Sequence, residues 1–120
     1  MDRAEAAVLI DRRRVAWLRE DVDAYLRMFH EAFTFTVNGV EVVRGRLALE
    51  NAVRRSYLRF RPVSWEFSEI AVQGQHVLAE WVATTEERAT GAARSIGAMS
   101  VCEMQDGLAV WQREYRLPAR

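Results

Sequence analysis

The sequence predicts an α+β fold in which a strongly curved antiparallel sheet wraps around three N-terminal helices. Three observations support this prediction. Helix-like apolar spacing is concentrated in the first half of the chain, Asn-Gly and Asp-Gly turn signals separate strand-like runs, and four strand-like segments follow one another at the end. The apolar stripes of the helices and one face of the sheet must be buried together, so the sheet is expected to curve around the helices.

Length and composition favour one globular domain over residues 1–120. Half of the residues are apolar and 28% are charged, which is typical of a folded domain with its own core. The 17 basic and 17 acidic side chains cancel, so we expect neither a nucleic acid nor a membrane surface as partner. Cys102 is the one cysteine, the chain starts without a signal-peptide pattern, and no apolar run is long enough to span a membrane. We therefore expect a cytoplasmic protein.

Residues 2–19 predict the first helix, with Val8, Val15 and Leu18 on its buried face. Its basic cluster, residues 12–14, is interpreted as a solvated face with packed aliphatic stems rather than as an anion site. A second helix is expected after Asp21, a good N-cap residue. Its buried side would hold Val22, Tyr25, Leu26 and Phe29. A third helix is predicted from about residue 47 to residue 60, ended by Pro62, with an apolar stripe formed by Leu49, Ala52, Val53, Tyr57 and Phe60.

The remaining segments predict strands. Residues 33–37 and 40–43 flank Asn38 and Gly39, which supply the positive φ angles of a type I′ hairpin turn. Four further strands are expected over residues 63–73, 76–89, 93–104 and 108–117. The predicted order is therefore helix, helix, hairpin, helix and four antiparallel strands.

Several segments of the chain resemble the nuclear-transport-factor-two-like superfamily, which includes SnoaL-like polyketide cyclases, limonene epoxide hydrolase and ketosteroid isomerase. The resemblance is carried by the sequences WLREDVDAY at 17–25, RGR at 44–46, VCEMQDG at 101–107 and WQREY at 111–115. It implies a cone-shaped α+β domain with a pocket in the cone. It also implies that the outer sheet face is a homodimer interface, here with Met99, Val101, Trp111, Arg113 and Tyr115.

The turns predict which side chains share the inner face. A three-residue turn at 105–107 would set Ala98 opposite Glu114 and Ser100 opposite Gln112. A two-residue turn at 90–91 would set Ala83 opposite Ala98 and Trp81 opposite Ser100, so that each cross-strand row has three side chains. Glu114 would then be a carboxylate between two alanines, next to empty volume. A two-residue turn at 106–107 would instead move Glu114 to the other face.

Glu114 is the candidate catalytic residue, because a carboxyl group in an apolar cone has a raised pKa and can act as general acid or base. The alternative is that Glu114 only forms an ion pair with a nearby arginine. Glu69 is a second candidate for the pocket face, and His30 is either a proton shuttle or a histidine at a helix end. The other expected lining residues are Trp17, Tyr25, Trp81, Ala83, Ala98, Ser100 and Gln112.

No metal or cofactor is expected. The chain has two histidines and one cysteine without metal-ligand spacing, and it has no glycine-rich phosphate loop. The resemblance to limonene epoxide hydrolase implies an Arg and an Asp where this chain has Trp81 and Ala83, which argues against water-driven epoxide opening. The positions implied by ketosteroid isomerase correspond to Arg13, Val37 and Ser100, so that mechanism is not expected either.

The function expected from this site is cofactor-free acid/base chemistry on a small apolar ligand. Isomerisation, cyclisation or dehydration of a polyketide-, terpenoid- or steroid-like substrate is what the resemblance to the SnoaL-like group implies. The alternative is a non-catalytic module that binds a ligand or only dimerises.

Overall fold

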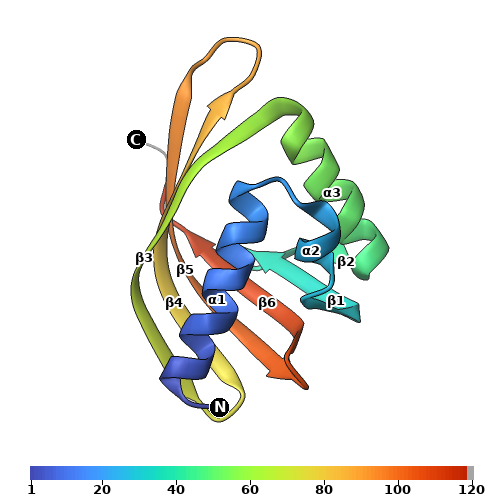
Figure 1. Ribbon diagram of the computed structural model, residues 1–120, viewed down its shortest axis with the longest axis vertical. Coiled ribbons are helices and arrows are strands. Elements are labelled where there is room, and N and C mark those ends of the chain that lie inside the picture. The colour runs from blue at the N-terminus through green and yellow to red at the C-terminus, as the bar shows by residue number, and fades with distance from the viewer. Residues whose placement is uncertain (119–120) are drawn as a thin grey trace.

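Helices and strands follow in the predicted order in the computed structural model, which describes residues 1–118 (Figure 1). The elements are α1 (Arg3–Leu18), α2 (Val22–Leu26), β1 (Phe29–Val37), β2 (Val40–Arg44), α3 (Arg46–Arg59), β3 (Phe60–Gln73), β4 (His76–Glu87), β5 (Ala93–Gln105) and β6 (Leu108–Arg116). The predicted α+β class is confirmed. A curved six-stranded sheet carries α1 against β3 and α3 against β1, β2 and β3, and α2 lies between the two longer helices.

The sheet is mixed rather than antiparallel throughout. Its strand order is β2-β1-β6-β5-β4-β3, and β1 and β6 run parallel while all other neighbours run antiparallel. After β2, the helix α3 carries the chain to β3 at the opposite edge, and the meander β3 to β6 returns to β1. This long connection allows the parallel junction, since parallel neighbours cannot be joined by a tight turn.

Two aspartates cap the first helices. The side chain of Asp2 accepts a hydrogen bond from the backbone N of Glu5 at 2.8 Å, and Asp21 accepts one from Ala24 at 3.1 Å. The cap predicted at Asp21 is confirmed. Helix α2 is shorter than expected, because Phe29 belongs to β1, where it is buried.

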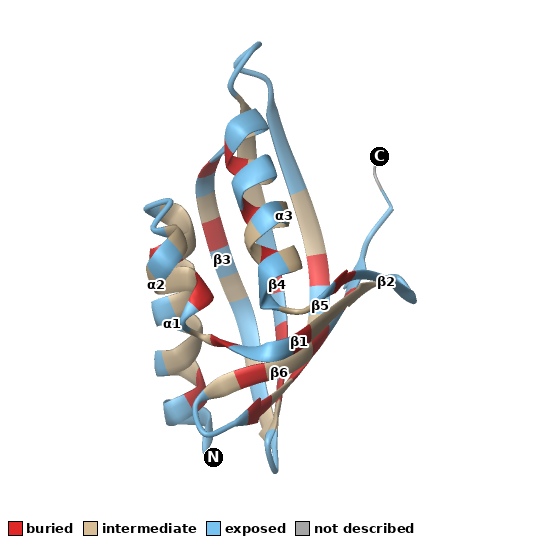
Figure 2. Cartoon of the chain, turned by 90° about the vertical axis from the view of Figure 1, so that its right-hand side faces the viewer, coloured by how far each residue is buried: buried red, intermediate tan, exposed pale blue. Residues whose placement is uncertain are grey.

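The predicted buried face of α1 is wrong at Val8, although Leu18 packs against a cluster of buried tryptophans of the sheet as expected. Val8 is 53% exposed, whereas Ala6 and Ala16 are buried and Ile10 and Trp17 pack against the core. Small alanines let the helix axis lie close to the sheet, and buried positions accordingly mark the sides of the helices that face it (Figure 2). No helix of residues 1–118 has the length and apolar character that a membrane crossing requires.

Asn38 and Gly39 form the predicted two-residue turn, with φ angles of 49° and 83°. The expected three-residue turn at the last hairpin is wrong: Asp106 and Gly107, with φ of 52° and 77°, form a two-residue turn that pairs Gln105 with Leu108. Such a turn alone would direct Glu114 outward.

A bulge in β6 reverses that effect. Met104 lies opposite Ala109 and Glu103 opposite Trp111, so Val110 is the extra residue. An extra residue shifts the alternation of side chains by one, which returns Glu114 to the inner face. Its partner on β5 is Ser100 rather than the predicted Ala98.

The turn predicted at Thr90 and Gly91 is also wrong. The loop spans residues 88–92, where the backbone N of Gly91 bonds to the carbonyl of Glu87 and the N of Glu87 bonds to the carbonyl of Ala92, both at 2.8 Å. Trp81 therefore lies opposite Ala98 instead of Ser100. A shift of two positions leaves every side chain on its predicted face, because the period of a strand is two.

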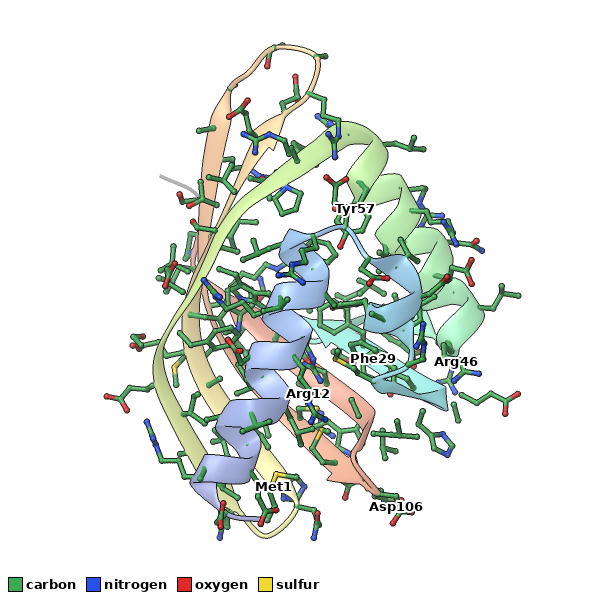
Figure 3. The ribbon with its side chains drawn as sticks, viewed as in Figure 1. Met1, Arg12, Phe29, Arg46, Tyr57 and Asp106 are labelled. Atoms are coloured by element: carbon green, nitrogen blue, oxygen red, sulfur yellow. The ribbon has the colours of Figure 1, made fainter. Side chains whose placement is uncertain are left out.

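Aromatic contacts join the helices to the inner face of the sheet, where Tyr25 of α2 lies 4.9 Å from Phe29 and Trp17 of α1 lies 6.4 Å from Trp65 between ring centroids. Further contacts lie within and between the strands. Phe29 and Phe33 pack edge to face with ring centroids 4.7 Å apart, in the space between helices and sheet where Phe29 is seen in Figure 3. Trp65 and Trp81 make a second edge contact at 5.6 Å. Burial of these large rings supplies much of the apolar area that holds the helices on the sheet.

Candidate functional site

A cavity of about 400 Å³ lies between the helices and the inner face of the sheet. Its size fits a small organic molecule. Aromatic and small apolar side chains make up most of its wall, and its polar side chains are four arginines, one acid, one glutamine, one serine, one threonine and one tyrosine. The lining residues are Trp17, Tyr25, Phe35, Ala52, Arg55, Ser56, Arg59, Phe60, Trp65, Trp81, Ala83, Thr85, Arg94, Ile96, Gln112, Glu114 and Arg116.

Glu114 is the acid of this cavity and is only 4% exposed. Burial raises the pKa of its carboxyl group, while the charge of Arg116 and hydrogen bonds from Arg116 and Gln112 lower it. The net direction is upward. The carboxylate also forms an ion pair with the Arg116 guanidinium. Glu114 therefore has both the raised pKa expected of a general acid or base and the arginine partner expected of a structural ion pair.

Gln112 connects Glu114 to the first helix. Arg13 Nη1 donates a hydrogen bond of 2.6 Å to Gln112 Oε1, and the Arg13 guanidinium lies 4.8 Å from the ring centre of Phe29. Because Arg13 occupies the amide oxygen, the amide NH₂ group is left for Glu114. This agrees with the lowering effect of Gln112 on the pKa of Glu114.

The interpretation of Arg13 as part of a solvated face is wrong. In chain order Ala6, Ile10, Arg13 and Trp17 are separated by four, three and four residues, which puts them on one face of a helix. This spacing could have identified Arg13 as a residue that points inward. The apolar stripe was assigned instead through Val8, which is exposed. Arg12 is exposed, as expected.

Tyr25 brings a phenol to the same cavity. Burial raises the pKa of Tyr25 to about 12, with a lowering contribution from the charge of Arg13 and a raising one from Glu114. Its hydroxyl is therefore protonated at neutral pH and can donate a hydrogen bond. Trp17, 5.5 Å away between ring centroids, forms the adjoining wall, and Tyr57 holds the Trp17 carbonyl through a 2.8 Å hydrogen bond.

The structure places most of the predicted site residues around this cavity. Those that line it are Trp17, Tyr25, Trp81, Ala83, Gln112 and Glu114. Ala98 is enclosed in a buried cluster with the two inner tryptophans. Ser100 lines a separate cavity of about 30 Å³, room for a water molecule, and accepts a 3.3 Å hydrogen bond from Trp81 Nε1.

Two candidate residues lie away from the cavity, and for His30 the structure agrees with the alternative of a histidine near a helix end. Glu69 is exposed and lies opposite Glu80, because Ser68 is an extra residue in β3 that shifts the alternation and puts Ile70 on the inner side. His30 is exposed at the start of β1, where its Nδ1 accepts a 3.0 Å hydrogen bond from the backbone N of Ala32. Neither side chain lines the cavity.

Sequence analysis also missed four arginines of the wall. Arg55 and Arg59 lie outside the apolar stripe predicted for the third helix, and Arg94 and Arg116 carried no pattern that distinguishes them. The cavity is open enough at this end for long side chains of α3 and β5 to reach its lining.

Two buried polar atoms of the wall have no hydrogen-bond partner within residues 1–118. They are Nε1 of Trp65 and Oγ1 of Thr85. Leaving such a group unpaired costs about 1–3 kcal/mol. The Trp65 N–H can only donate, whereas the Thr85 hydroxyl can donate or accept. As for metals, no three His, Cys, Asp or Glu side chains of the described chain cluster closely enough to ligate one ion.

A curved sheet closed by three helices around a cavity with one buried acid defines the nuclear-transport-factor-two-like class of α+β cones. The sequence profile of the SnoaL-like domain family matches residues 11–112, and the chain belongs to this family. Among curated proteins, none matches the chain.

Solved structures show the same fold. A proposed isomerase from Bacillus subtilis is 18% identical with a TM-score of 0.84, covering 98% of this chain and 91% of its own. An LEH-like epoxide hydrolase from M. tuberculosis is 20% identical with a TM-score of 0.82, covering 95% and 84%. A proposed polyketide cyclase from Xanthomonas campestris is 22% identical with a TM-score of 0.76, covering 96% and 92%. At these identities the likeness establishes the fold and assigns no reaction.

Proposed function

We propose that this protein binds a small, largely apolar organic molecule and transfers protons on it through Glu114, without a cofactor. The reaction classes are isomerisation, cyclisation or dehydration of a polyketide-, terpenoid- or steroid-like substrate. The observation that carries the proposal is a nearly inaccessible carboxyl group with a raised pKa in the wall of an aromatic cavity.

The groups around Glu114 suit proton transfer next to a carbonyl. The Glu114 carboxylate takes a proton from a carbon beside the carbonyl, and the neutral Tyr25 hydroxyl donates to the oxygen on which negative charge develops. The carboxylic acid then returns the proton to another carbon, so an isomerisation leaves Glu114 as it began. Gln112, held by Arg13, keeps the carboxylate in place between the two steps.

The ion pair with Arg116 supports a second candidate, a ligand-binding module without turnover. In that case Arg116 keeps Glu114 charged and Glu114 only orients Arg116. The two candidates differ in whether Glu114 exchanges protons with a bound ligand.

Deuterium exchange distinguishes them. Polyketide-, terpenoid- and steroid-like ketones that raise the melting temperature are incubated with the protein in D₂O, and NMR follows deuterium at the carbon beside the carbonyl. The proposed enzyme catalyses incorporation, Glu114→Gln abolishes it, and Glu69→Gln, at an exposed position, leaves it unchanged. Binding without incorporation by the wild-type protein would favour the binding module.

We also propose that the outer face of the sheet pairs two copies of the chain. Met99 and Tyr115 lie opposite each other there and are 57% and 53% exposed, and the neighbouring row contains Leu78 and Val101. Glu80 and Arg113 lie at the ends of these two rows, so the apolar side chains are flanked by charges of opposite sign. Exposed apolar side chains grouped in this way are typical of a protein interface.

A further inference from the structure

We propose that the ligand of this cavity is an amphipathic anion. Its carboxylate or phosphate group binds Arg55, Arg59 and Arg94 at the cavity mouth, and its apolar body lies against the tryptophans. This inference rests on the proposed binding function of the cavity and adds the charge and orientation of the ligand.

The three arginines converge on the cavity from two elements. Arg55 and Arg59 are one helical turn apart on α3, and Arg94 lies near the start of β5. Two of these arginines contact the ring of Phe60 at the beginning of β3. The Cζ atoms of Arg59 and Arg94 lie 4.9 and 4.7 Å from the ring centre. Cation–π contacts with one ring therefore hold two like charges at the same side of the cavity.

Positive charge at this mouth exceeds what nearby acids neutralise. The cavity wall contains four arginines and one acid, although basic and acidic residues balance over the chain. Arg116 is paired with Glu114, and Arg59 lies 3.5 Å from Glu87. Within residues 1–118, neither Arg55 nor Arg94 has a carboxylate within ion-pairing distance.

An anionic oxygen group is the partner that this arrangement fits. Guanidinium groups present several N–H donors in one plane and bind carboxylates and phosphates through paired hydrogen bonds. Bringing the cations together without an anion costs repulsion, which a bound anion relieves. Because the three guanidinium groups are exposed, salt screens this attraction, so the affinity for an anion is expected to depend on ionic strength.

Burial sets the orientation of such a ligand. Arg55, Arg59 and Arg94 are exposed, whereas Glu114 and the inner tryptophans Trp65 and Trp81 are buried. The anionic group therefore stays at the mouth, where it also remains away from the Glu114 carboxylate. The apolar body extends inward along the tryptophans toward the buried acid.

The experiment compares 2-naphthoate with 2-naphthamide, which has nearly the same shape without the charge. Binding is measured by isothermal titration and by quenching of tryptophan fluorescence. We expect naphthoate to bind about 10-fold tighter than naphthamide or more, because hydrogen bonds to a charged group are stronger than those to a neutral one. Added salt is expected to weaken the binding of naphthoate and to leave that of naphthamide unchanged. 2-Naphthyl phosphate, measured in parallel, distinguishes a carboxylate from a phosphate preference.

Substitutions test whether the arginines cause the preference. Arg55→Gln and Arg94→Gln each reduce the ratio of naphthoate to naphthamide affinity several-fold and leave naphthamide binding unchanged. Arg54→Gln is the matched control, since Arg54 is next to Arg55 on α3 but pairs with Glu50 at 2.9 Å and does not line the cavity. Equal affinity of the wild-type protein for the two compounds would overturn the proposal, as would a preference that survives both cavity substitutions.

Failure of this inference differs from failure of the proposed function. A charge preference without any proton exchange on bound ketones keeps the anion site and removes Glu114 from catalysis. Proton exchange on neutral ketones together with equal binding of naphthoate and naphthamide keeps the reaction and overturns the anion site.

Discussion

Arg13 on the first helix donates a 2.6 Å hydrogen bond to Gln112 on the last strand, 99 positions later in the chain. The bond orients the amide of Gln112, whose other end stabilises the charged form of Glu114. Arg13, which has no carboxylate partner within residues 1–118, is thereby connected through one amide to Glu114, the candidate proton-transfer residue. The helix α1 contributes to the site through this contact as well as by covering the sheet.

We predict that Arg13→Met destabilises the protein by about 1–3 kcal/mol, because it leaves the oxygen of Gln112 without its donor. Urea unfolding measures this change. Arg12→Met, at the exposed neighbouring position, is the control and is expected to stay within about 0.5 kcal/mol of the wild-type protein. Equal effects of the two substitutions would contradict the role given to Arg13.

The same substitution raises the pKa of Glu114 further. A freed Gln112 amide rotates and no longer holds its N–H donors on the carboxylate, so the charged form loses a stabilising hydrogen bond. NMR titration of the Glu114 carboxyl carbon measures the change. An unchanged titration midpoint in Arg13→Met would show that Gln112 keeps its orientation without Arg13.

The raised pKa of Glu114 makes stability depend on pH. A carboxyl group with a higher pKa in the folded state binds its proton more tightly there, so the folded protein is favoured at low pH. This contribution is lost as pH rises from the ordinary value of 4.5 through the raised folded pKa. We therefore expect the unfolding free energy of the wild-type protein, relative to Glu114→Gln, to fall over this interval.

Urea unfolding of both proteins at a series of pH values tests this expectation. Below pH 4.5 the two free energies are expected to lie within about 1 kcal/mol of each other, because glutamine has the shape and the neutrality of the protonated side chain. A difference that grows with pH in favour of the wild-type protein would mean that the pair with Arg116 outweighs burial.

Gly107→Ala should cost about 1 kcal/mol through backbone strain. The residue has a φ of 77°, and an added Cβ would meet nothing within 4 Å, so crowding makes no contribution. Gly97→Ala offers the opposite case: its φ needs no glycine, but its Cβ would lie 3.2 Å from the exposed Leu117 side chain. We expect thermal unfolding to show the larger loss for Gly107→Ala, and the reverse order would contradict the strain argument.

The outer face of the sheet predicts a dimer that Met99→Glu disrupts. Met99 points to solvent in the single chain, so the substitution leaves the core intact while placing a charge at the proposed interface. Sedimentation velocity is expected to show a dimer for the wild-type protein and a monomer for the variant. Glu66→Gln, at an exposed position on β3, is the control, and a monomeric wild-type protein would remove the interface.

Local chemistry predicted most of the elements. Asn38 and Gly39 identify their turn because few residue pairs accept two positive φ angles, and Asp21 identifies a helix start because its carboxylate satisfies a free backbone N–H. Glu114 was assigned to the inner face through an incorrect turn and an unforeseen bulge at Val110, two errors of register that cancel. The bulge at Ser68 moved Glu69 to the outer face of the sheet, and no second bulge follows that would return it to the inner face.

The chain's own pattern was thus sufficient for the order of helices and strands, the turn at Asn38 and Gly39, and the family, since these depend on neighbours in sequence. Bulges, the inward side of α1 and the arginines at the cavity mouth depend on contacts between residues far apart in the chain. Val110 is the extra residue of a strand that pairs with both β5 and β1, and Arg13 lies inward, where it contacts Gln112 and Phe29. Such contacts exist only once the sheet has closed around the helices, so the composition of the site was settled by packing.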